Sequence, residues 1–266
     1  MKKAERACVI MQILTENPNK DYPLGYFAEK LSCAKSSISE DLQLVRSAMD
    51  AAGYGYIETT SGSKGGVRYV PYIMDQMAAN VVENIRSRLE EPDRMLGGGF
   101  IYTSDIMFNP EMMRAAAHLF ARHFAATDAN VVVTVEARGI SVALETAELL
   151  NLPLIVIRRE SSVSDGSTVS INFFSGSTDS IQKMSLSKRA LKAGSKAIII
   201  DDFMRGGGSM KGVEDMLKEF DCTAVGKAVV MAASIEGTSR NQDCYTLFLL
   251  DANESGGYNV RVNPKL

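Results

Sequence analysis

The sequence predicts a two-domain α/β protein, with a small helical domain at the N-terminus and a larger domain built on a parallel β-sheet. Apolar residues recur at helical spacing through residues 4–52, and from residue 131 onward short Val- and Ile-rich runs alternate with helical segments. Near-continuous apolar runs of this kind fit strands that are covered on both faces. Pro71 marks a boundary, which gives domains at residues 1–72 and 73–266.

Composition favours a soluble globular protein. The chain has 266 residues, of which 45% are hydrophobic and 23% charged, and this length is sufficient for two cores. The charged N-terminus leads into no long apolar region, and no run approaches the length of a membrane helix, so we expect a cytoplasmic protein with no membrane partner. A net charge of −3 argues against nonspecific coating of nucleic acid but allows a local basic surface.

The cysteines and histidines predict no metal site. The four cysteines are widely scattered with no Cys-x-x-Cys pair, so reduced and mostly buried thiols are expected. His118 and His123 are five positions apart, which does not stack them on one helix face, and no cysteine is near them in the sequence.

Three helices are predicted in the first domain, at residues 4–16, 23–31 and 34–52. The third has apolar residues at spacings of four, three and four on one side, as expected for a helix packed on a core. Its opposite face and first turn carry small polar and basic side chains that can approach phosphates and base edges, namely Lys35, Ser36, Ser37, Ser39, Gln43 and Arg46. Short helices with a tight second turn predict a helix-turn-helix.

A hairpin follows the helices. Strands are predicted at residues 54–60 and 67–70, joined by a glycine-rich tip that bears Lys64, with Arg68 near its end. Three helices and a basic-tipped hairpin are typical of a winged helix, and we predict that Lys64 and Arg68 join the third helix in contacting double-stranded DNA. The alternatives are a small helical dimerisation domain with a solvated hairpin, or a winged helix that contacts protein.

The remainder of the chain predicts the second domain in order. A long amphipathic helix is expected at residues 73–90, a short strand at 100–102 and an alanine-rich helix at 111–126. The alternation that predicts the sheet then comprises strands at 131–135, 154–157, 198–200 and 224–231 and helices at 141–150 and 209–220.

Residues 198–209 read Ile-Ile-Ile-Asp-Asp-Phe-Met-Arg-Gly-Gly-Gly-Ser and predict a strand, a loop and a helix start. Backbone N–H groups of Gly206 to Ser209 at a helix N-terminus favour an anion such as phosphate. Asp201 and Asp202 would repel phosphate, so they are expected to face sugar hydroxyls or Mg²⁺. A phosphorylated sugar satisfies both halves, whereas an ordinary Gly-rich turn is the alternative. Lys211 replaces the third glycine of a dinucleotide fingerprint, and no Gly-Lys-Ser/Thr sequence exists for a Walker loop.

This stretch resembles the 5-phosphoribosyl-1-diphosphate (PRPP) signature of type I phosphoribosyltransferases, an apolar strand followed by Asp-Asp and Thr-Gly-Gly-Thr/Ser. Gly206 stands where most of those enzymes have threonine. The resemblance implies a parallel α/β domain of phosphoribosyltransferase type, with PRPP, alone or with Mg²⁺, as ligand. The acids would hold the ribose hydroxyls and the loop the 5′-phosphate, and the residues so implied are Asp201, Asp202, Phe203, Met204, Arg205, Gly206, Gly207, Gly208 and Ser209.

A second loop follows the strand at residues 131–135. In an open α/β sheet, loops at the carboxyl ends of neighbouring strands line one crevice. The Glu-Ala-Arg-Gly loop resembles the diphosphate-binding loop of adenine-type phosphoribosyltransferases, which implies PRPP contacts from Glu136, Ala137, Arg138 and Gly139. Arg158 and Arg159 are further predicted diphosphate contacts, although arginines that end a strand are more often at the surface. The region between Arg159 and Lys192, with a Ser-rich segment at 161–168 and a strand-like run at 169–174, lies where the enzymes have a mobile catalytic hairpin. Its segment 161–168 has no Lys or Arg.

Three segments, the helix at residues 36–42, the wing at 65–69 and the loop at 201–209, together resemble the purine operon repressor family of Gram-positive bacteria. The resemblance implies a homodimeric repressor of purine biosynthesis genes that binds operator DNA, is released by PRPP as effector and requires no cofactor. Guanosine tetraphosphate, with its two diphosphates, is a predicted competing corepressor.

Two other functions remain open from the sequence. The first is an active purine phosphoribosyltransferase with a regulatory N-terminal domain, because binding PRPP is also the first half of catalysis. Catalysis further needs a base pocket and a closing loop that stabilises the departing diphosphate. Neither has a clear motif here, which favours binding over catalysis. The second is a protein-contact winged helix on a nucleotide sensor.

Overall fold

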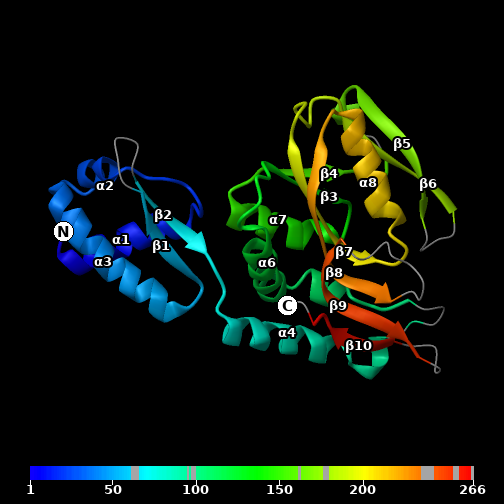
Figure 1. Cartoon of the computed structure of the whole chain (residues 1–266), viewed down its shortest axis with the longest axis horizontal. Coiled ribbons are helices and arrows are strands. Elements are labelled where there is room, and N and C mark those ends of the chain that lie inside the picture. The colour runs from blue at the N-terminus through cyan, green and yellow to red at the C-terminus, as the bar shows by residue number, and fades with distance from the viewer. Residues whose placement is uncertain are drawn as a thin grey trace.

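The computed structural model contains two domains, and the chain passes from the first into a long helix that packs on the second (Figure 1). It describes residues 1–60, 66–94, 96, 100–160, 163–175, 180–234, 243–253 and 258–264. The predicted two-domain α/β class is confirmed, with three helices and a hairpin in the N-terminal domain and a mostly parallel sheet in the C-terminal domain. Among the described residues, no helix is both long and apolar enough to span a bilayer.

The N-terminal domain has the predicted elements in the predicted order. These are α1 (Lys3–Thr15), α2 (Leu24–Lys30), α3 (Lys35–Ala52), β1 (Gly55–Thr59) and β2 (Val67–Pro71). The strands pair antiparallel, and an isolated bridge between Tyr22 and Val67 adds the segment before α2 to the same sheet. In Figure 1 this sheet lies between the helices of the domain and the second domain. The tip of the wing, with Lys64, lies outside the described residues.

The core of this domain follows the apolar stripe predicted on α3. Ile38, Leu42, Val45 and Met49 are all buried, and α3 ends where Gly53 adopts a left-handed conformation with φ +76°. One polar contact in this core was not predicted. The fully buried carboxylate of Asp41 accepts hydrogen bonds from Arg6 in α1, with distances of 2.6 Å to Nε and 3.1 Å to Nη2. Pairing offsets the cost of burying that charge.

The second domain is built on a six-stranded sheet in the order β10-β9-β8-β7-β3-β4. Five strands are parallel, and β10 pairs antiparallel with β9 at one edge, so the sheet is mixed instead of wholly parallel. The strand bounds are β3 (Val131–Val135), β4 (Leu154–Ile157), β7 (Lys196–Met204), β8 (Thr223–Ser234), β9 (Tyr245–Ala252) and β10 (Tyr258–Val262).

Both faces of the sheet are covered. One apolar cluster joins it to α4 (Asp75–Leu89), α6 (Pro110–Phe124) and α7 (Gly139–Leu150). The other joins it to α8 (Gly208–Glu219) and an antiparallel hairpin of β5 (Thr168–Ser175) and β6 (Ser180–Ser187). Coverage on both faces explains the continuous Val and Ile runs of β3 and β7.

Several elements differ from the sequence prediction. The predicted strand at residues 100–102 is not one, because only Ile101 forms a bridge. Strands β6, β9 and β10 were not predicted, and β7 is longer than the apolar run at 198–200, since it continues through the acid pair to Met204. Short helices complete the domain, namely α5 (Ser104–Met107) and the 3₁₀ turns Pro92–Arg94 and Val163–Asp165.

Direct polar contacts between the two domains are sparse in the described part of the chain. The Asn19 side-chain amide donates to the Leu149 carbonyl at 2.8 Å, and the rings of Tyr54 and His118 lie 5.4 Å apart. The connecting segment is fixed by Arg122, which donates to the Ile73 carbonyl at 3.0 Å. The N-terminal end of α4 is therefore attached to α6 and lies beside the end of α3.

Candidate functional site

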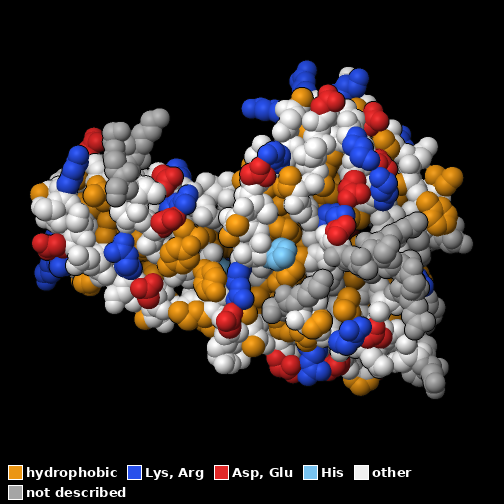
Figure 2. Space-filling view, in the orientation of Figure 1, with side chains coloured by type: hydrophobic (Ala, Val, Ile, Leu, Met, Phe, Trp, Pro, Cys, Tyr) orange, Lys and Arg blue, Asp and Glu red, His pale blue; other side chains and the backbone are white. Residues whose placement is uncertain are grey.

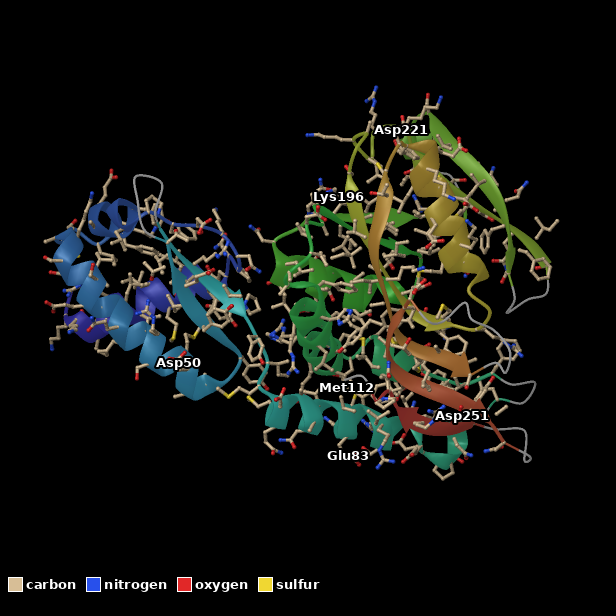
Figure 3. The ribbon with its side chains drawn as sticks, in the orientation of Figure 1. Asp50, Glu83, Met112, Lys196, Asp221 and Asp251 are labelled. Carbon is tan, nitrogen blue, oxygen red and sulfur yellow. The ribbon has the colours of Figure 1, made fainter. Side chains whose placement is uncertain are left out.

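The acid pair lies at the carboxyl end of β7, and the turn after it leads directly into α8. Gly207 has φ +72°, a conformation that residues other than glycine rarely adopt, and it is the N-cap of α8. The predicted strand, loop and helix start are thus confirmed. Lys196, labelled in Figure 3, begins β7. The acid pair lies near the other end of this strand, at the sheet edge where the parallel strand β3 also ends.

A cavity of about 520 Å³ opens at this edge and brings the two predicted loops together. The predicted PRPP-binding residues that line it are Glu136, Ala137, Arg138, Arg159, Asp201, Asp202, Phe203, Met204, Arg205, Gly206, Gly207, Gly208 and Ser209. Loops some sixty residues apart in the sequence therefore face one space, as the carboxyl-edge rule requires. That these residues bind PRPP stays a prediction.

Two other predicted residues do not line the cavity. Gly139 lies behind it, where a Cβ atom would come within 2.5 Å of Asp201 Oδ1 and 2.8 Å of Thr134 Oγ1. The absence of a side chain at Gly139 therefore allows the Asp201 carboxylate to approach α7. Arg158 is turned toward Glu136 and Asp165, at 3.6 and 3.5 Å. Arg158 thus contributes charge near the loop without facing the cavity.

The carboxylates of the acid pair have different surroundings. Asp202 Oδ2 lies 2.8 Å from Arg138 Nε, and Asp201 Oδ1 accepts a hydrogen bond of 2.9 Å from the Asp202 backbone N–H. Burial, followed by the charge of Asp202, raises the pKa of the Asp201 carboxyl well above its ordinary value. The site therefore holds a carboxyl group whose ionised form would gain from a cation or from hydrogen-bond donors such as sugar hydroxyls.

The second loop is held by its own contacts. The Glu136 carboxylate accepts a 2.6 Å hydrogen bond from the Arg159 backbone N–H, while the Arg159 side chain donates to Gln182 in β6 at 2.9 Å. Arg138 also donates to Thr103 Oγ1 at 3.3 Å, in addition to pairing with Asp202. The Arg138 side chain is 42% exposed, so it is accessible to an anion in the cavity.

Sequence reasoning missed part of the cavity lining. Its further lining residues are Phe100, Ile101, Thr103, Val135, Ser175, Met210 and Met231. Phe100 is an exposed aromatic ring that lies 6.0 Å from the Arg205 guanidinium. These residues come from separate segments without a shared motif, and only the Gly-Gly-Gly run before Phe100 marked the region as irregular.

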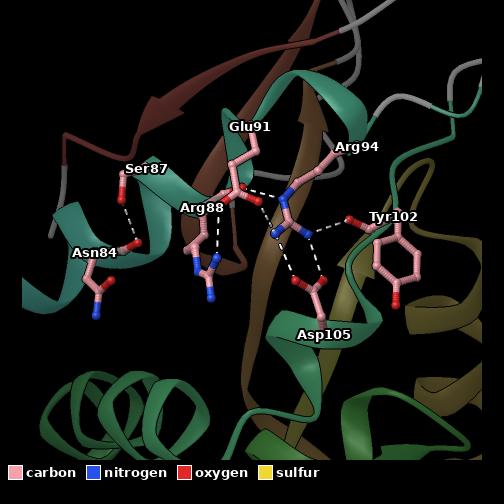
Figure 4. A network of polar contacts seen from close by, with 7 residues as sticks. All are labelled: Asn84, Ser87, Arg88, Glu91, Arg94, Tyr102 and Asp105. Atoms are coloured by element: carbon pink, nitrogen blue, oxygen red, sulfur yellow. Dashed lines mark hydrogen bonds and ion pairs between the residues drawn. The ribbon is translucent and has the colours of Figure 1, made fainter.

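Phe100, Ile101 and Thr103 form one wall of the cavity. The segment that follows them is held by a buried arginine, as Figure 4 shows. Arg94 is 4% exposed and donates two hydrogen bonds, of 2.7 and 2.8 Å, to the Asp105 carboxylate. It also donates to Glu91 at 2.6 Å, to the Tyr102 carbonyl at 3.2 Å and to the Arg88 carbonyl. The end of α4 is thereby connected to residues 102–105.

On the N-terminal domain, most predicted DNA contacts lie on the outer face of α3. Lys35, Ser36, Ser39 and Gln43 are exposed, and Ser37 is half-buried. Figure 2 shows Lys and Arg mixed with Asp and Glu on the visible face of this domain, without a continuous basic patch. DNA contact by these residues stays a prediction, as it does for Lys64.

Two predicted arginines have other partners. Arg46 connects α3 to β1 by donating to Thr59 Oγ1 at 2.9 Å. Arg68 pairs with Glu58 across the hairpin at 2.6 Å, on the strand face opposite buried Ile57 and Tyr69.

Arg68 and Glu58 line a cavity of about 320 Å³ between the wing and the second domain, together with Phe124 and Leu150. The strand period of two therefore directs Arg68 toward the second domain, which disfavours its predicted contact with DNA.

Comparisons with known proteins agree with this geometry. Residues 2–71 match the bacterial purine repressor N-terminal domain, and residues 103–262 match the phosphoribosyl transferase domain. The chain is similar to solved adenine phosphoribosyltransferases. That from Rhodothermus marinus has TM-score 0.55 and 17% identity over 65% of this chain and 99% of that one. That from Thermoanaerobacter pseudethanolicus has TM-score 0.54 and 14% identity over 63% and 99%. At these identities the likeness establishes the fold alone.

Similarity to curated regulators extends over most of the chain. A probable purine biosynthesis transcriptional regulator PurR of Streptococcus pneumoniae is 42% identical over 86% of this chain and 84% of its own length. The purine biosynthesis transcriptional repressor PurR of Bacillus subtilis is 39% identical over 87% and 81%. The corresponding activator of Lactococcus lactis is 36% identical over 94% and 93%.

Fold and cavity together define a class of protein in which a winged-helix module is joined to a phosphoribosyltransferase-type ligand domain. Within that class, this chain belongs to the PurR family of purine biosynthesis transcriptional regulators.

Neutralising Asp201 should stabilise the ligand-free protein at neutral pH. The folded state holds the pKa of Asp201 above its unfolded value, so the unfolded chain ionises first as pH rises and the fold loses stability. Asp201→Asn removes this cost. A gain of about 1 kcal/mol in the free energy of unfolding would raise the Tm by about 2–4 °C. Thermal denaturation in chelator-containing buffer should show a higher Tm for Asp201→Asn than for the wild type at about pH 7.5. This difference should shrink toward about pH 4.5.

Asp251→Asn is the matched control, because Arg261 lowers the pKa of Asp251. The Asp251 carboxylate therefore stabilises the fold above its unfolded pKa, and its neutralisation should lower the Tm at neutral pH or leave it unchanged. A lower Tm for Asp201→Asn at neutral pH would contradict the described electrostatics of the acid pair.

Proposed function

We propose that this protein represses transcription of purine biosynthesis genes by binding operator DNA through the winged helix, and that PRPP bound at the carboxyl edge of the sheet releases it. One observation carries the proposal. A single cavity contains two adjacent carboxylates, a glycine loop at a helix N-terminus and an arginine-bearing second loop. That set matches a sugar diol, a monophosphate and a diphosphate, the polar groups of PRPP.

In this proposal each part of the cavity binds one part of the ligand. Asp201 and Asp202 accept hydrogen bonds from the ribose hydroxyls. The N–H groups of residues 206–209 bind the 5′-phosphate at the positive end of α8. Residues 136–139 and the Arg138 guanidinium bind the diphosphate. Mg²⁺ would accompany that diphosphate and offset the negative charge of Asp201, whose raised pKa marks it as a group that gains from a nearby cation.

Release from DNA then follows from linkage. If the PRPP-bound protein holds its winged helices in a geometry unsuited to the operator, each ligand must weaken the binding of the other by the same factor. Relatives are named both as repressor and as activator, at 39% and 36% identity. We assign repression to this chain, and transcription from a purine promoter in a purified system is the direct test of the sign.

The protein is proposed to act as a cytoplasmic homodimer, because a two-fold pair of winged helices can bind two half-sites of one operator. Titration of operator DNA at concentrations well above Kd gives the stoichiometry. One bound chain per operator at saturation would contradict this assignment.

An active purine phosphoribosyltransferase is the second candidate. Xanthine phosphoribosyltransferases are similar at 26% identity, the one from Oenococcus oeni over 66% of this chain. We favour binding without catalysis, because the higher similarity, over 86% of this chain, is to a regulator and segment 161–168 has no cationic residue to stabilise a departing diphosphate. Formation of a nucleotide from PRPP and xanthine, hypoxanthine or adenine would overturn that choice.

The central experiment measures fluorescence anisotropy of a labelled purine-promoter fragment with and without PRPP and Mg²⁺ at fixed salt. Saturating PRPP should weaken DNA binding by about 5–150-fold, the usual range of allosteric coupling. Asp201→Ala and Asp202→Ala should bind DNA as the wild type does but lose this response. A wild-type response that persists in both variants would exclude the acid pair from the effector site.

A contact with DNA phosphate on α3 can be measured separately. Lys35→Ala should weaken operator binding and reduce the slope of log K against log salt concentration by about 1, as expected when one phosphate contact is lost. Arg68→Ala is the matched control because Arg68 faces the second domain, and its slope should equal that of the wild type. Equal slopes in all three proteins would mean that Lys35 does not contact phosphate.

Guanosine tetraphosphate is proposed as a competing corepressor, since its two diphosphates suit the two loops of the cavity. In calorimetric titrations it should bind the free protein and raise the apparent Kd of PRPP in proportion to its concentration. Operator affinity should be kept or increased in its presence. An unchanged PRPP titration at saturating guanosine tetraphosphate would exclude a shared site.

A further inference from the structure

One wall of the effector cavity and the helix leading to the winged helix are connected through a single side chain. The wall consists of Phe100, Ile101 and Thr103. Two residues further on, Asp105 accepts two hydrogen bonds from Arg94. Arg94 also bonds the Arg88 carbonyl in the last turn of α4, so its planar guanidinium spans both segments (Figure 4).

Arginine is the residue type that this position requires. Its donors contact two carboxylates and two backbone carbonyls at once, with four of these contacts between 2.6 and 3.2 Å. Lysine has a single nitrogen and could not span them. The arginine is buried, and its pairing with Asp105 lowers the pKa of that carboxyl, which keeps the charged contact at neutral pH. Segments 88–94 and 102–105 are therefore held as one unit.

The cavity side of this unit leads to the acid pair. Thr103 is 2% exposed, and its hydroxyl accepts a hydrogen bond from Arg138, whose guanidinium also pairs with Asp202 at 2.8 Å. A sugar diol on Asp202 would compete for the carboxylate that Arg138 now holds, and a diphosphate on residues 136–139 would attract the same guanidinium. Binding of such a ligand exchanges the partners of Arg138 and removes the donor from Thr103.

The other side of the unit leads to α3. Helix α4 begins directly after the wing, and its first turn packs on the end of α3, because a Cβ at Gly53 would lie 2.7 Å from Met77 Sδ and 3.3 Å from Met74 Sδ. The Met74 N–H also donates to the Gly53 carbonyl at 3.2 Å. A shift of α4 would therefore act on the C-terminal end of the predicted recognition helix.

We infer that Arg94 is a positioning residue that transmits occupancy of the effector cavity to α4 and so to the DNA-binding domain. The inference rests on the proposed function, since it assumes that a PRPP-type ligand and operator DNA weaken each other's binding. A continuous series of contacts does not by itself establish coupling, so the test must measure coupling and not affinity alone.

The experiment determines a full thermodynamic cycle for the wild type and two conservative variants. Asp105→Asn weakens the bidentate contact with Arg94, and Thr103→Val removes the hydroxyl that Arg138 contacts. PRPP binding is measured by calorimetry without DNA, and operator binding by anisotropy with and without saturating PRPP and Mg²⁺. Asp105→Asn should bind each ligand alone within about 3-fold of the wild type. In both variants the coupling factor, a ratio of affinities measured in the same protein, should fall about 5-fold or more, toward one.

Arg86→Gln is the matched control. Arg86 also lies on α4 and forms exposed ion pairs with Glu83 and Glu90, which do not touch residues 100–105. Its variant should keep the wild-type coupling factor. Thermal denaturation of all proteins identifies any that are unfolded, and Thr103→Val carries the test if Asp105→Asn is unfolded.

The outcomes separate this inference from the proposed function. Wild-type coupling in both folded variants would overturn the role of Arg94, while the PRPP-responsive repressor would stand. Parallel losses of PRPP affinity and operator affinity with unchanged coupling would give Arg94 a structural role only and also overturn the inference. A wild-type protein whose operator binding ignores PRPP would remove the proposed function and this inference together.

Discussion

The structure depends on placing two adjacent carboxylates beside a glycine loop at a helix N-terminus. Asp201 and Asp202 lie near the end of β7, a few residues before the α8 N-terminus, and the pKa of Asp201 is raised by burial and by its neighbour. Three features accommodate this unfavourable charge. Gly139 leaves space for the Asp201 carboxylate, Arg138 pairs with Asp202, and the sheet fixes both loops at one edge. Such electrostatic strain is characteristic of sites that bind ligands.

This arrangement explains which parts were predictable from sequence. The loop at 201–209 and the Glu-Ala-Arg-Gly loop are local patterns, and strand–loop–helix logic placed both at one edge correctly. The wall at Phe100–Thr103 depends on tertiary packing by Arg94, which leaves no periodic signal. Strands β9 and β10 were missed although β9 is mostly apolar and β10 alternates apolar and polar residues. Arg68 was predicted to contact DNA because of its charge, whereas strand alternation directs it to the other domain.

The two domains differ in how they use buried charge. In the N-terminal domain the Arg6–Asp41 pair connects α1 to α3 at the edge of the core. In the second domain Arg94 and Arg138 connect segments that border a cavity. Arg94 is buried, whereas the Arg138 side chain is 42% exposed. Breaking the Arg94 contacts would leave an uncompensated buried charge, so Arg94 restricts the conformations open to the segments that it connects.

The polar cavity between the wing and the second domain has a consequence for the joint between the two domains. Its walls include the Glu58–Arg68 pair, so the surfaces that meet there are already suited to water. Polar groups on such a surface can exchange their partners for water when the two domains shift, which costs less free energy than exposing apolar surface. The position of the winged helix therefore depends on the connection at α4 and on the few direct contacts between the domains, such as that of Asn19 with Leu149.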